Sequence, residues 1–261
     1  MHIKAANSGK APDCVVMNVT VRSMKLHGGA FGSRGGYRPS QEELDAENID
    51  AVVRGAQGNL DRHIRNMAGF GMPVIVSINR FAADTDGELE ALAAAARVSG
   101  AHAVTLTEVH AKGGEGGEPL AKAVVSAIQD HVAAGRPFTP LFVNDAPIMD
   151  KVNGIAQRIY KADGVMVENK AKKQLATIES WGYGHLPVCM AKTQYSFSHD
   201  AGQLGAPVGF TIPVREFRLN AGAGFIVAVL GNMMTMPGLP KRPAAADMDM
   251  DENGQLTGVF G

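Results

Sequence analysis

The chain has very little cysteine and no long apolar segment, and both shortages limit what it can be. Cys14 and Cys189 are the only cysteines among its 261 residues, and both lie in apolar, strand-like runs. Buried, reduced thiols are therefore expected rather than a disulfide. The longest strongly apolar run, Phe225 to Leu230, is far shorter than the roughly 20 residues that span a bilayer. The polar start also lacks a signal-peptide core, so the sequence predicts a cytoplasmic protein without a membrane partner.

The chain has no excess of positive charge. Its 25 lysines and arginines stand against 26 acidic residues, which gives a net charge of −1. Such a chain has no field that would attract nucleic acid or an anionic membrane. We therefore expect no polyanionic partner.

Recognisable metal sites are also missing. The histidines show no metal-ligand spacing, and Cys189 with His185 supplies too few ligands for zinc. Residues 249–254 have the opening of a calcium loop, but Phe260 stands where the bidentate glutamate is required. No metal site is predicted. Asn253-Gly254 is better explained as the tight turn of a hairpin between 248–251 and 255–259.

A phosphate-binding loop is absent as well. Such a loop has the form Gly-x-x-x-x-Gly-Lys-Ser/Thr and supplies backbone amides and a lysine to nucleotide phosphates. The only Gly-Lys pair, Gly9-Lys10, is followed by Ala11 and lies too near the start to complete the motif. The chain alone is therefore not expected to carry out nucleotide-dependent phosphorylation.

What the sequence does contain is an alternation of β-rich runs and helical patterns, which predicts an α/β fold with parallel βαβ units. The expected strands are 14–21, 74–79, 103–107, 141–144, 165–168, 188–190 and 210–214. Capping boxes at Ser40 and Thr85 predict helices that begin at about Gln41 and Asp86. Apolar residues at three- and four-residue spacing predict further helices over 120–132, 148–160 and 170–181.

A polar loop follows the expected strand at 188–190. Ligands of open α/β sheets bind beyond the carboxyl ends of strands. The loop carries Lys192, Thr193, Gln194 and Tyr195, which are candidates for polar substrate contacts. The alternative is a loop whose side chains satisfy its own buried backbone.

Several segments resemble one known family. The sequence Leu-Pro-Val-Cys-Met-Ala-Lys-Thr-Gln-Tyr-Ser at 186–196 is similar to a segment of formate–tetrahydrofolate ligases, and 18–29 resembles their Val-Ala-Thr-Val-Arg-Ala-Leu-Lys-Met-His-Gly-Gly signature. Further similar segments follow in the family's order at 59–60, 63–64, 73–81, 84–85, 111–114, 234–240 and 258–260. The resemblance covers nearly the whole chain, but only about the C-terminal half of the usual enzyme.

The resemblance implies an enzyme that uses ATP to activate formate as formyl phosphate and passes the formyl group to N10 of tetrahydrofolate. Mg²⁺ would accompany ATP, and the family commonly forms homotetramers activated by a monovalent cation. Since the family's phosphate loop belongs to the other half, this chain is expected to be inactive unless a separate N-terminal half completes it. Two alternatives stay open: a non-catalytic folate- or nucleotide-binding module, and a scaffold that assembles with full-length subunits.

The resemblance also implies three parts. Residues 1–71 would end the nucleotide-binding domain with a partial parallel sheet, and 72–224 would form a second α/β domain with helices packed on a mainly parallel sheet. Residues 225–261 would form a small C-terminal hairpin segment. Because strands of the first part would be missing, an open sheet edge is expected near 14–21, which would favour aggregation.

By resemblance, the folate site would contain Phe81, His110 and the Lys112-Gly113-Gly114 turn. The family's phenylalanine and an aromatic residue of its glycine loop sandwich the folate, and His110 replaces the usual tryptophan. An imidazole offers a smaller stacking face, so weaker folate binding is expected. The alternatives are a half-buried phenylalanine at a strand end, a solvated loop histidine and a mobile glycine turn.

An edge of the nucleotide or formyl-phosphate site is expected from two further segments besides the loop at 192–195. Lys25 and His27 precede a Gly-Gly pair, where a cation beside exposed amides would suit an anion. The alternative is a surface lysine and a turn histidine. Met236, Pro237 and Gly238 match a family motif near the nucleotide, although two prolines around a glycine also make a rigid turn.

Overall fold

The structure is a computed structural model that describes residues 3–5, 8–32, 39–231, 242–250, 252 and 256–257. The chain divides into two compact units, Met1–Gly231 and Asn232–Gly261. Each unit is described by itself below. Among the described residues, no helix combines the length and apolar character that crossing a membrane requires.

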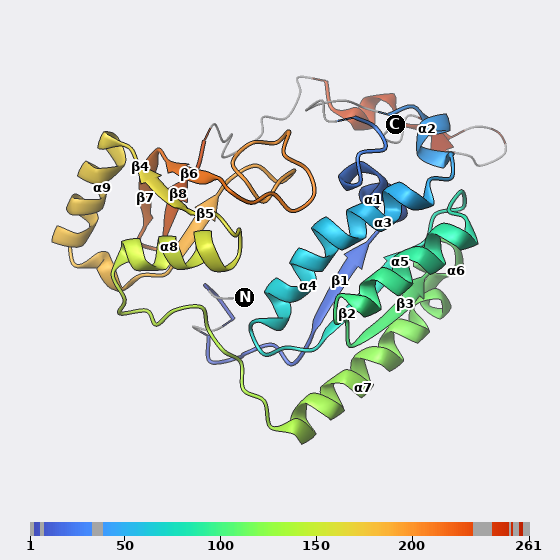
Figure 1. The fold of residues 1–261 in the computed structure, drawn as a ribbon, viewed down its shortest axis with the longest axis horizontal. Coiled ribbons are helices and arrows are strands. Elements are labelled where there is room, and N and C mark those ends of the chain that lie inside the picture. The colour runs from blue at the N-terminus through green and yellow to red at the C-terminus, as the bar shows by residue number, and fades with distance from the viewer. Residues whose placement is uncertain are drawn as a thin grey trace. The chain divides into compact units, whose positions relative to one another are not determined.

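The first sheet of the larger unit is parallel, with the order β1-β2-β3 (Figure 1). Its strands are β1 (Val15–Val19), β2 (Val74–Asn79) and β3 (Ala103–Thr107). The first five residues of β2 are buried, as expected for a central parallel strand covered on both faces. The α/β fold class is therefore confirmed.

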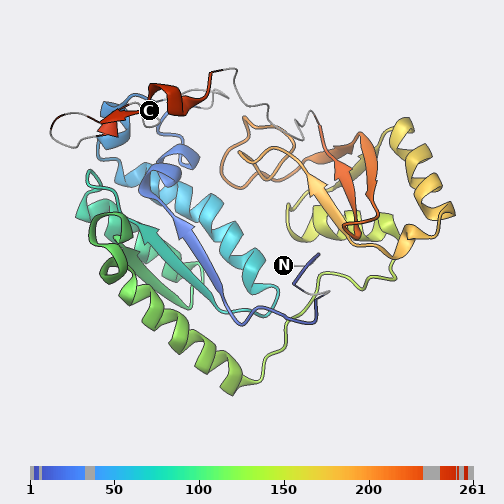
Figure 2. The ribbon, with the colours of Figure 1, turned by 180° about the vertical axis from the view of Figure 1, so that it is seen from behind.

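Helices connect these strands and cover them. They are α1 (Val21–His27), α2 (Gln41–Asp45), α3 (Ile49–Gly55), α4 (Asp61–Ala68), α5 (Asp86–Val98), α6 (Val109–Lys112) and α7 (Glu118–Ala134). The predicted capping boxes are present, because Ser40 and Thr85 accept hydrogen bonds from the backbone of Glu43 and Glu88. The long helix α7 packs along β2 and β3, as Figure 2 shows from behind.

The segment after β1 differs from the prediction. The expected strand 14–21 ends at Val19, and Thr20 caps α1 instead. Gly28 packs closely against α3, because a Cβ atom there would lie 1.8 Å from the carbonyl oxygen of Ala51. Gly55 likewise approaches the carbonyl oxygen of Met24, at 2.0 Å from such a Cβ. Glycine at these two positions lets α1 and α3 pack backbone against backbone.

The rest of the larger unit contains smaller sheets. Strand β4 (Gly164–Val167) pairs in parallel with β6 (Thr211–Val214), and β8 (Phe225–Val229) lies between parallel β5 (Val188–Ala191) and antiparallel β7 (Glu216–Asn220). Helices α8 (Ile148–Arg158) and α9 (Asn169–Ser180) pack against these strands. The predicted strand 141–144 is wrong, since these residues form bends and a turn.

The predicted boundaries after Gly71 and Gly224 do not coincide with breaks between sheets. Residues on the two sides of Gly71 share one sheet, because β1 pairs with β2 from Val15–Val74 to Val19–Ile78. Gly224 precedes β8, which completes the sheet of β5. The three-part division therefore stays a prediction, whereas the compact larger unit extends to Gly231.

The smaller unit contains the predicted hairpin pairing. Strand β9 (Asp249–Met250) pairs antiparallel with β10 (Leu256–Thr257), and Met250 lies opposite Leu256. A two-residue turn at Asn253-Gly254 would place Met250 opposite Thr257, so the observed register differs by one residue. The turn residues themselves lie outside the described residues.

Strand β1 is at the edge of its sheet, as predicted. Within the described residues its only partner strand is β2. Val16, the second residue of the strand, keeps 45% of its surface exposed. An exposed apolar edge of this kind can accept a further strand.

A buried ion pair fixes the helices around the first sheet. The ammonium of Lys25 lies 2.8 Å from the carboxylate of Glu88, and their side chains are 1% and 0% exposed. Lys25 Nζ also donates to the carbonyl oxygens of Leu44 and Ala46, at 3.1 and 2.9 Å. Glu88 in turn accepts from the backbone N–H of Asn48 at 2.7 Å. The pair therefore joins α1, the 44–48 segment and α5.

Removing the cation should strongly destabilise the fold. Lys25→Met leaves the Glu88 carboxylate buried without a counter-charge, which should lower the free energy of unfolding by about 3–5 kcal/mol. Lys112→Met is the matched control, because Lys112 pairs with Glu108 at an exposed site and should cost less than about 1 kcal/mol. Denaturant unfolding measures both. Equal stabilities of the two variants would contradict the proposed role of the buried pair.

Candidate functional site

The carboxyl ends of β2 and β3 form a pocket of about 650 Å³. It is lined by Asn79, Arg80, Phe81, Ala82, Glu108, His110 and Ala111. The structure thus brings together Phe81 and His110, two of the predicted folate residues, from the segments that follow neighbouring strands. This is the position at which open parallel sheets bind ligands.

Phe81 is held in place by polar neighbours. Its backbone N–H donates to Asp84 Oδ2 at 2.8 Å, and the guanidinium of Arg22 lies 4.4 Å from its ring centre. Arg22 also binds Asp45 at 3.1 Å. Burial raises the pKa of the Asp84 carboxyl, while the hydrogen bond from Phe81 acts in the opposite direction. One ring face of Phe81 is therefore stacked on a cation that is itself anchored.

The other wall of the pocket carries charge. His110 is exposed on the short helix α6. Lys112 Nζ donates to Glu108 at 2.6 Å, and Arg80 lies 4.0 Å from the same carboxylate. The hydrogen bond from Lys112 lowers the pKa of the Glu108 carboxyl. Lys112 and Arg80 thus both pair with Glu108, beside the imidazole of His110.

The glycine turn has a defined backbone. Gly113 has φ 59°, and residues Gly113–Gly117 form a 3-10 turn that leads into α7. A Cβ atom on Gly116 would lie 2.5 Å from the carbonyl group of Glu108, whose N–H donates to the Gly116 oxygen at 3.1 Å. Gly113 and Gly114 have open space around them. Close packing at Gly116 thus shapes the turn, while Gly113 and Gly114 leave the backbone accessible.

Lys25 does not fit the predicted anion site. A lysine ammonium has three donors, and those of Lys25 face Glu88, Leu44 O and Ala46 O. The side chain is 1% exposed, so the alternative of a surface lysine is wrong as well. Its role in this structure is to hold the helices together.

His27 and Lys192 come together with residues that the sequence analysis did not select. His27 Nδ1 accepts from the Gly205 N–H at 3.2 Å, and burial lowers the pKa of His27. The ring of His63 lies 4.5 Å from that of Phe197. Burial, followed by the charges of His27, Lys192 and Arg62, lowers the pKa of His63 to about 4.

Lys192 forms no ion pair with a carboxylate among the described residues. Its Nζ donates to the backbone oxygens of Thr193 and Ser196 and lies 5.1 Å from the ring centre of Tyr160. Burial lowers its pKa to about 8. We call His27, Arg62, His63 and Lys192 the cationic cluster.

The remainder of the polar loop mainly satisfies itself. Ser196 Oγ donates to the backbone carbonyl oxygen of Gln203 at 2.5 Å, and Ser198 Oγ donates to the backbone carbonyl oxygen of Asp200 at 3.1 Å. Thr193 Oγ1 accepts from the Tyr195 N–H at 3.3 Å. Tyr195 keeps 55% of its surface exposed, and Gln194 is exposed too. Substrate contacts by Thr193, Gln194 and Tyr195 stay a prediction.

Three predicted residues, Met236, Pro237 and Gly238, lie outside the described residues. No group of His, Cys, Asp and Glu within the described part of the chain could hold a metal ion. Cys14 and Cys189 are free thiols, as predicted, but both are half-buried rather than buried. Burial raises the pKa of each.

The sequence analysis missed Arg22, Asp84 and His63 as individual residues. All three lie in segments that were noted only for their resemblance, at 18–29, 63–64 and 84–85. Arg22 and His27 lie five residues apart on α1 and point to different sides of the helix. Arg22 contacts Phe81, whereas His27 contacts Gly205. Helical spacing within the first segment could have separated these two sides.

Comparison with known proteins decides the family. Residues 1–260 match the family described as "Formate--tetrahydrofolate ligase". The chain belongs to this family. It is 48% identical to the formate–tetrahydrofolate ligase of Roseobacter denitrificans and 46% identical to that of Ruegeria sp., each over 260 residues. A third relative, from Maricaulis maris, is 45% identical over 258 residues.

The similarity covers the chain but not its relatives. Each alignment takes in 99–100% of this chain and 44% of the relative. The chain thus spans less than half the length of the formate–tetrahydrofolate ligases that it matches.

The cationic cluster makes a testable prediction about titration. Histidine signals in NMR should give His63 a pKa below the usual range, toward about 4. Lys192→Gln should raise this pKa because it removes a nearby positive charge. His63 is an exposed residue, and solvent screens charges at such a site. The test is therefore the direction of the pKa change.

Lys172→Gln is the matched control for this titration. Lys172 is exposed on α9 and is not among the groups that act on His63. It should leave the pKa of His63 unchanged. A His63 pKa that responds equally to both substitutions, or to neither, would contradict the cluster.

Proposed function

We propose that this chain is the folate-binding, C-terminal part of a formate–tetrahydrofolate ligase. The observation that carries the proposal is the shared pocket: Phe81 and His110, which the family resemblance pairs around folate, line one cavity of about 650 Å³. That volume lies within the range of roughly 300–1,000 Å³ usual for small-molecule sites. Family membership supports the substrate class.

In this proposal the pterin ring inserts between Phe81 and His110. Arg22 covers one face of Phe81, so the ligand uses the side of the phenylalanine that faces the cavity. Aromatic contact of this kind supplies area and orientation. The open backbone at Gly113 and Gly114 lets the ligand approach the turn closely.

The complete reaction needs ATP, Mg²⁺ and formate. Formate would be phosphorylated, and N10 of tetrahydrofolate would then attack the carbonyl carbon of formyl phosphate and release phosphate. The polypeptide would contribute chiefly by positioning the amine and stabilising the anionic leaving group. Lys192 in the cationic cluster is a candidate for the latter task, because its charge has no carboxylate partner among the described residues.

The chain lacks a Gly-x-x-x-x-Gly-Lys-Ser/Thr loop, so we propose that it does not energise formate by itself. A separate polypeptide that carries the phosphate loop would supply this step. The alternative of a non-catalytic folate-binding module rests on the same absence, since it retains the folate pocket and needs no phosphate loop.

Folate binding can be tested directly on the chain. Phe81→Ala should weaken tetrahydrofolate binding about tenfold, because it removes one aromatic wall. His110→Trp should tighten it, because indole offers the larger stacking face. Isothermal titration calorimetry measures both affinities.

The control for His110→Trp is Val132→Trp, which adds an indole at a residue of α7 that is 67% exposed and should leave the affinity unchanged. If neither Phe81→Ala nor His110→Trp changes the affinity, the folate ligand does not occupy this pocket.

Complementation separates a partial enzyme from a binding module. The chain alone should form no 10-formyltetrahydrofolate from formate, ATP and tetrahydrofolate. Adding the phosphate-loop half of a relative should restore the product. The 10-formyltetrahydrofolate formed is converted with acid and measured by its absorbance. Folate binding without restored product would favour the module, and product from the chain alone would refute the proposed division of labour.

A further inference from the structure

A second pocket lies at the opposite end of the same strands. The folate candidate pocket includes Asn79 at the end of β2, whereas this one includes Pro73 and Val74 at its start. Its volume is about 420 Å³, and it is lined by Ala68, Gly71, Met72, Pro73, Val74, Gly100, His102, Asp130, His131, Ala134 and Arg136. A strand of this length separates the pockets by about 20 Å.

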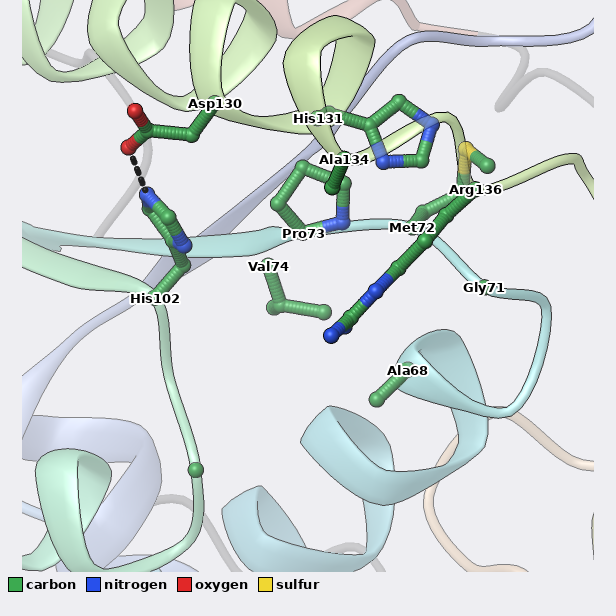
Figure 3. Close-up of a pocket in the computed structure, with 11 residues that line it drawn as sticks. Ala68, Gly71, Met72, Pro73, Val74, His102, Asp130, His131, Ala134 and Arg136 are labelled. Carbon is green, nitrogen blue, oxygen red and sulfur yellow. Dashed lines mark ion pairs between the residues drawn. The ribbon is translucent and has the colours of Figure 1, made fainter.

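The polar groups of this pocket are not equivalent. His102 Nε2 lies 3.3 Å from Asp130 Oδ2, so the only carboxylate among the lining residues already has a partner (Figure 3). Arg136 has no ion-pair or hydrogen-bond partner within the described part of the chain. Its side chain runs past Met72 toward Val74 and Ala68, with the guanidinium at the pocket (Figure 3). The pocket thus presents the guanidinium of an exposed residue that pairs with no carboxylate of the described residues.

The pocket is also lined by small apolar side chains. Met72 and Val74 are only 3% and 2% exposed, so the apolar carbon that a ligand could touch comes mainly from Ala68, Pro73 and Ala134. Gly100 has φ 94° and no atom within 4 Å of a Cβ position, which leaves the rim beside His102 open. A bound molecule would meet a cation at one end and aliphatic carbon along its body.

We propose that this cavity, the Arg136 pocket, binds a small organic monocarboxylate. The guanidinium matches a carboxylate through two parallel N–H···O hydrogen bonds. The side chains of Ala68, Pro73 and Ala134 match a ring or short hydrocarbon body. A dianion fits less well, because the carbonyl end of α7 and Asp130 add negative charge beside His131.

Benzoate is the probe for this site, and the full chain is titrated with it while the His102 and His131 ring signals are followed by NMR. We expect saturable shifts of both signals. Arg136→Gln should weaken benzoate binding at least tenfold. Arg136→Lys should give an intermediate affinity, because it keeps the positive charge but cannot form the two parallel hydrogen bonds of a guanidinium. Benzamide, which has the ring without the charge, should not compete.

Arg97→Gln is the control, since Arg97 is an exposed arginine that does not line the pocket. It should bind benzoate as the parent does. Equal affinities of Arg136→Gln and the parent, at unchanged melting temperatures, would overturn the proposal. A response to inorganic phosphate as strong as that to benzoate would overturn the assignment of a carboxylate with an apolar body.

Discussion

The ion pair between Lys25 and Glu88 is the interaction on which the geometry of the larger unit depends. It is almost fully withdrawn from water, so each charge must find all its partners inside the protein. Lys25 comes from the helix after β1, and Glu88 lies in the first turn of the helix after β2. Arg22, which supports Phe81, lies one turn before Lys25 on α1. The pocket wall is thereby coupled to the core.

Local signals predicted much of the fold. The strand 74–79 and the helix starts at Gln41 and Asp86 agree with the structure, because a continuous apolar run and capping boxes are encoded within a few residues. The helices α1 and α3 were missed, since their contact depends on glycines brought together by the fold. The expected strand 141–144 had suitable residues but acquired no neighbouring strand to pair with in the described structure.

The candidate site could be predicted only in part. Resemblance selected Phe81 and His110, and the sheet places them at one cavity. The same reasoning could not reveal that Lys25 is buried, because its partner Glu88 is remote in sequence and was recognised only as half of a capping box. The cationic cluster was equally hidden: it combines His27 and His63 with Lys192, from a loop beyond β5. Such groupings are properties of tertiary contact.

The position of β1 has a geometric consequence for any polypeptide that joins this chain. Neighbouring strands lie about 4.8 Å apart, so a parallel strand added beside β1 would run roughly 10 Å from β2. Its carboxyl end would lie at the same edge of the sheet as Asn79 and Phe81. A reactive group carried there would need only a short reach to meet a molecule seated over β2, without any hinge between the two polypeptides.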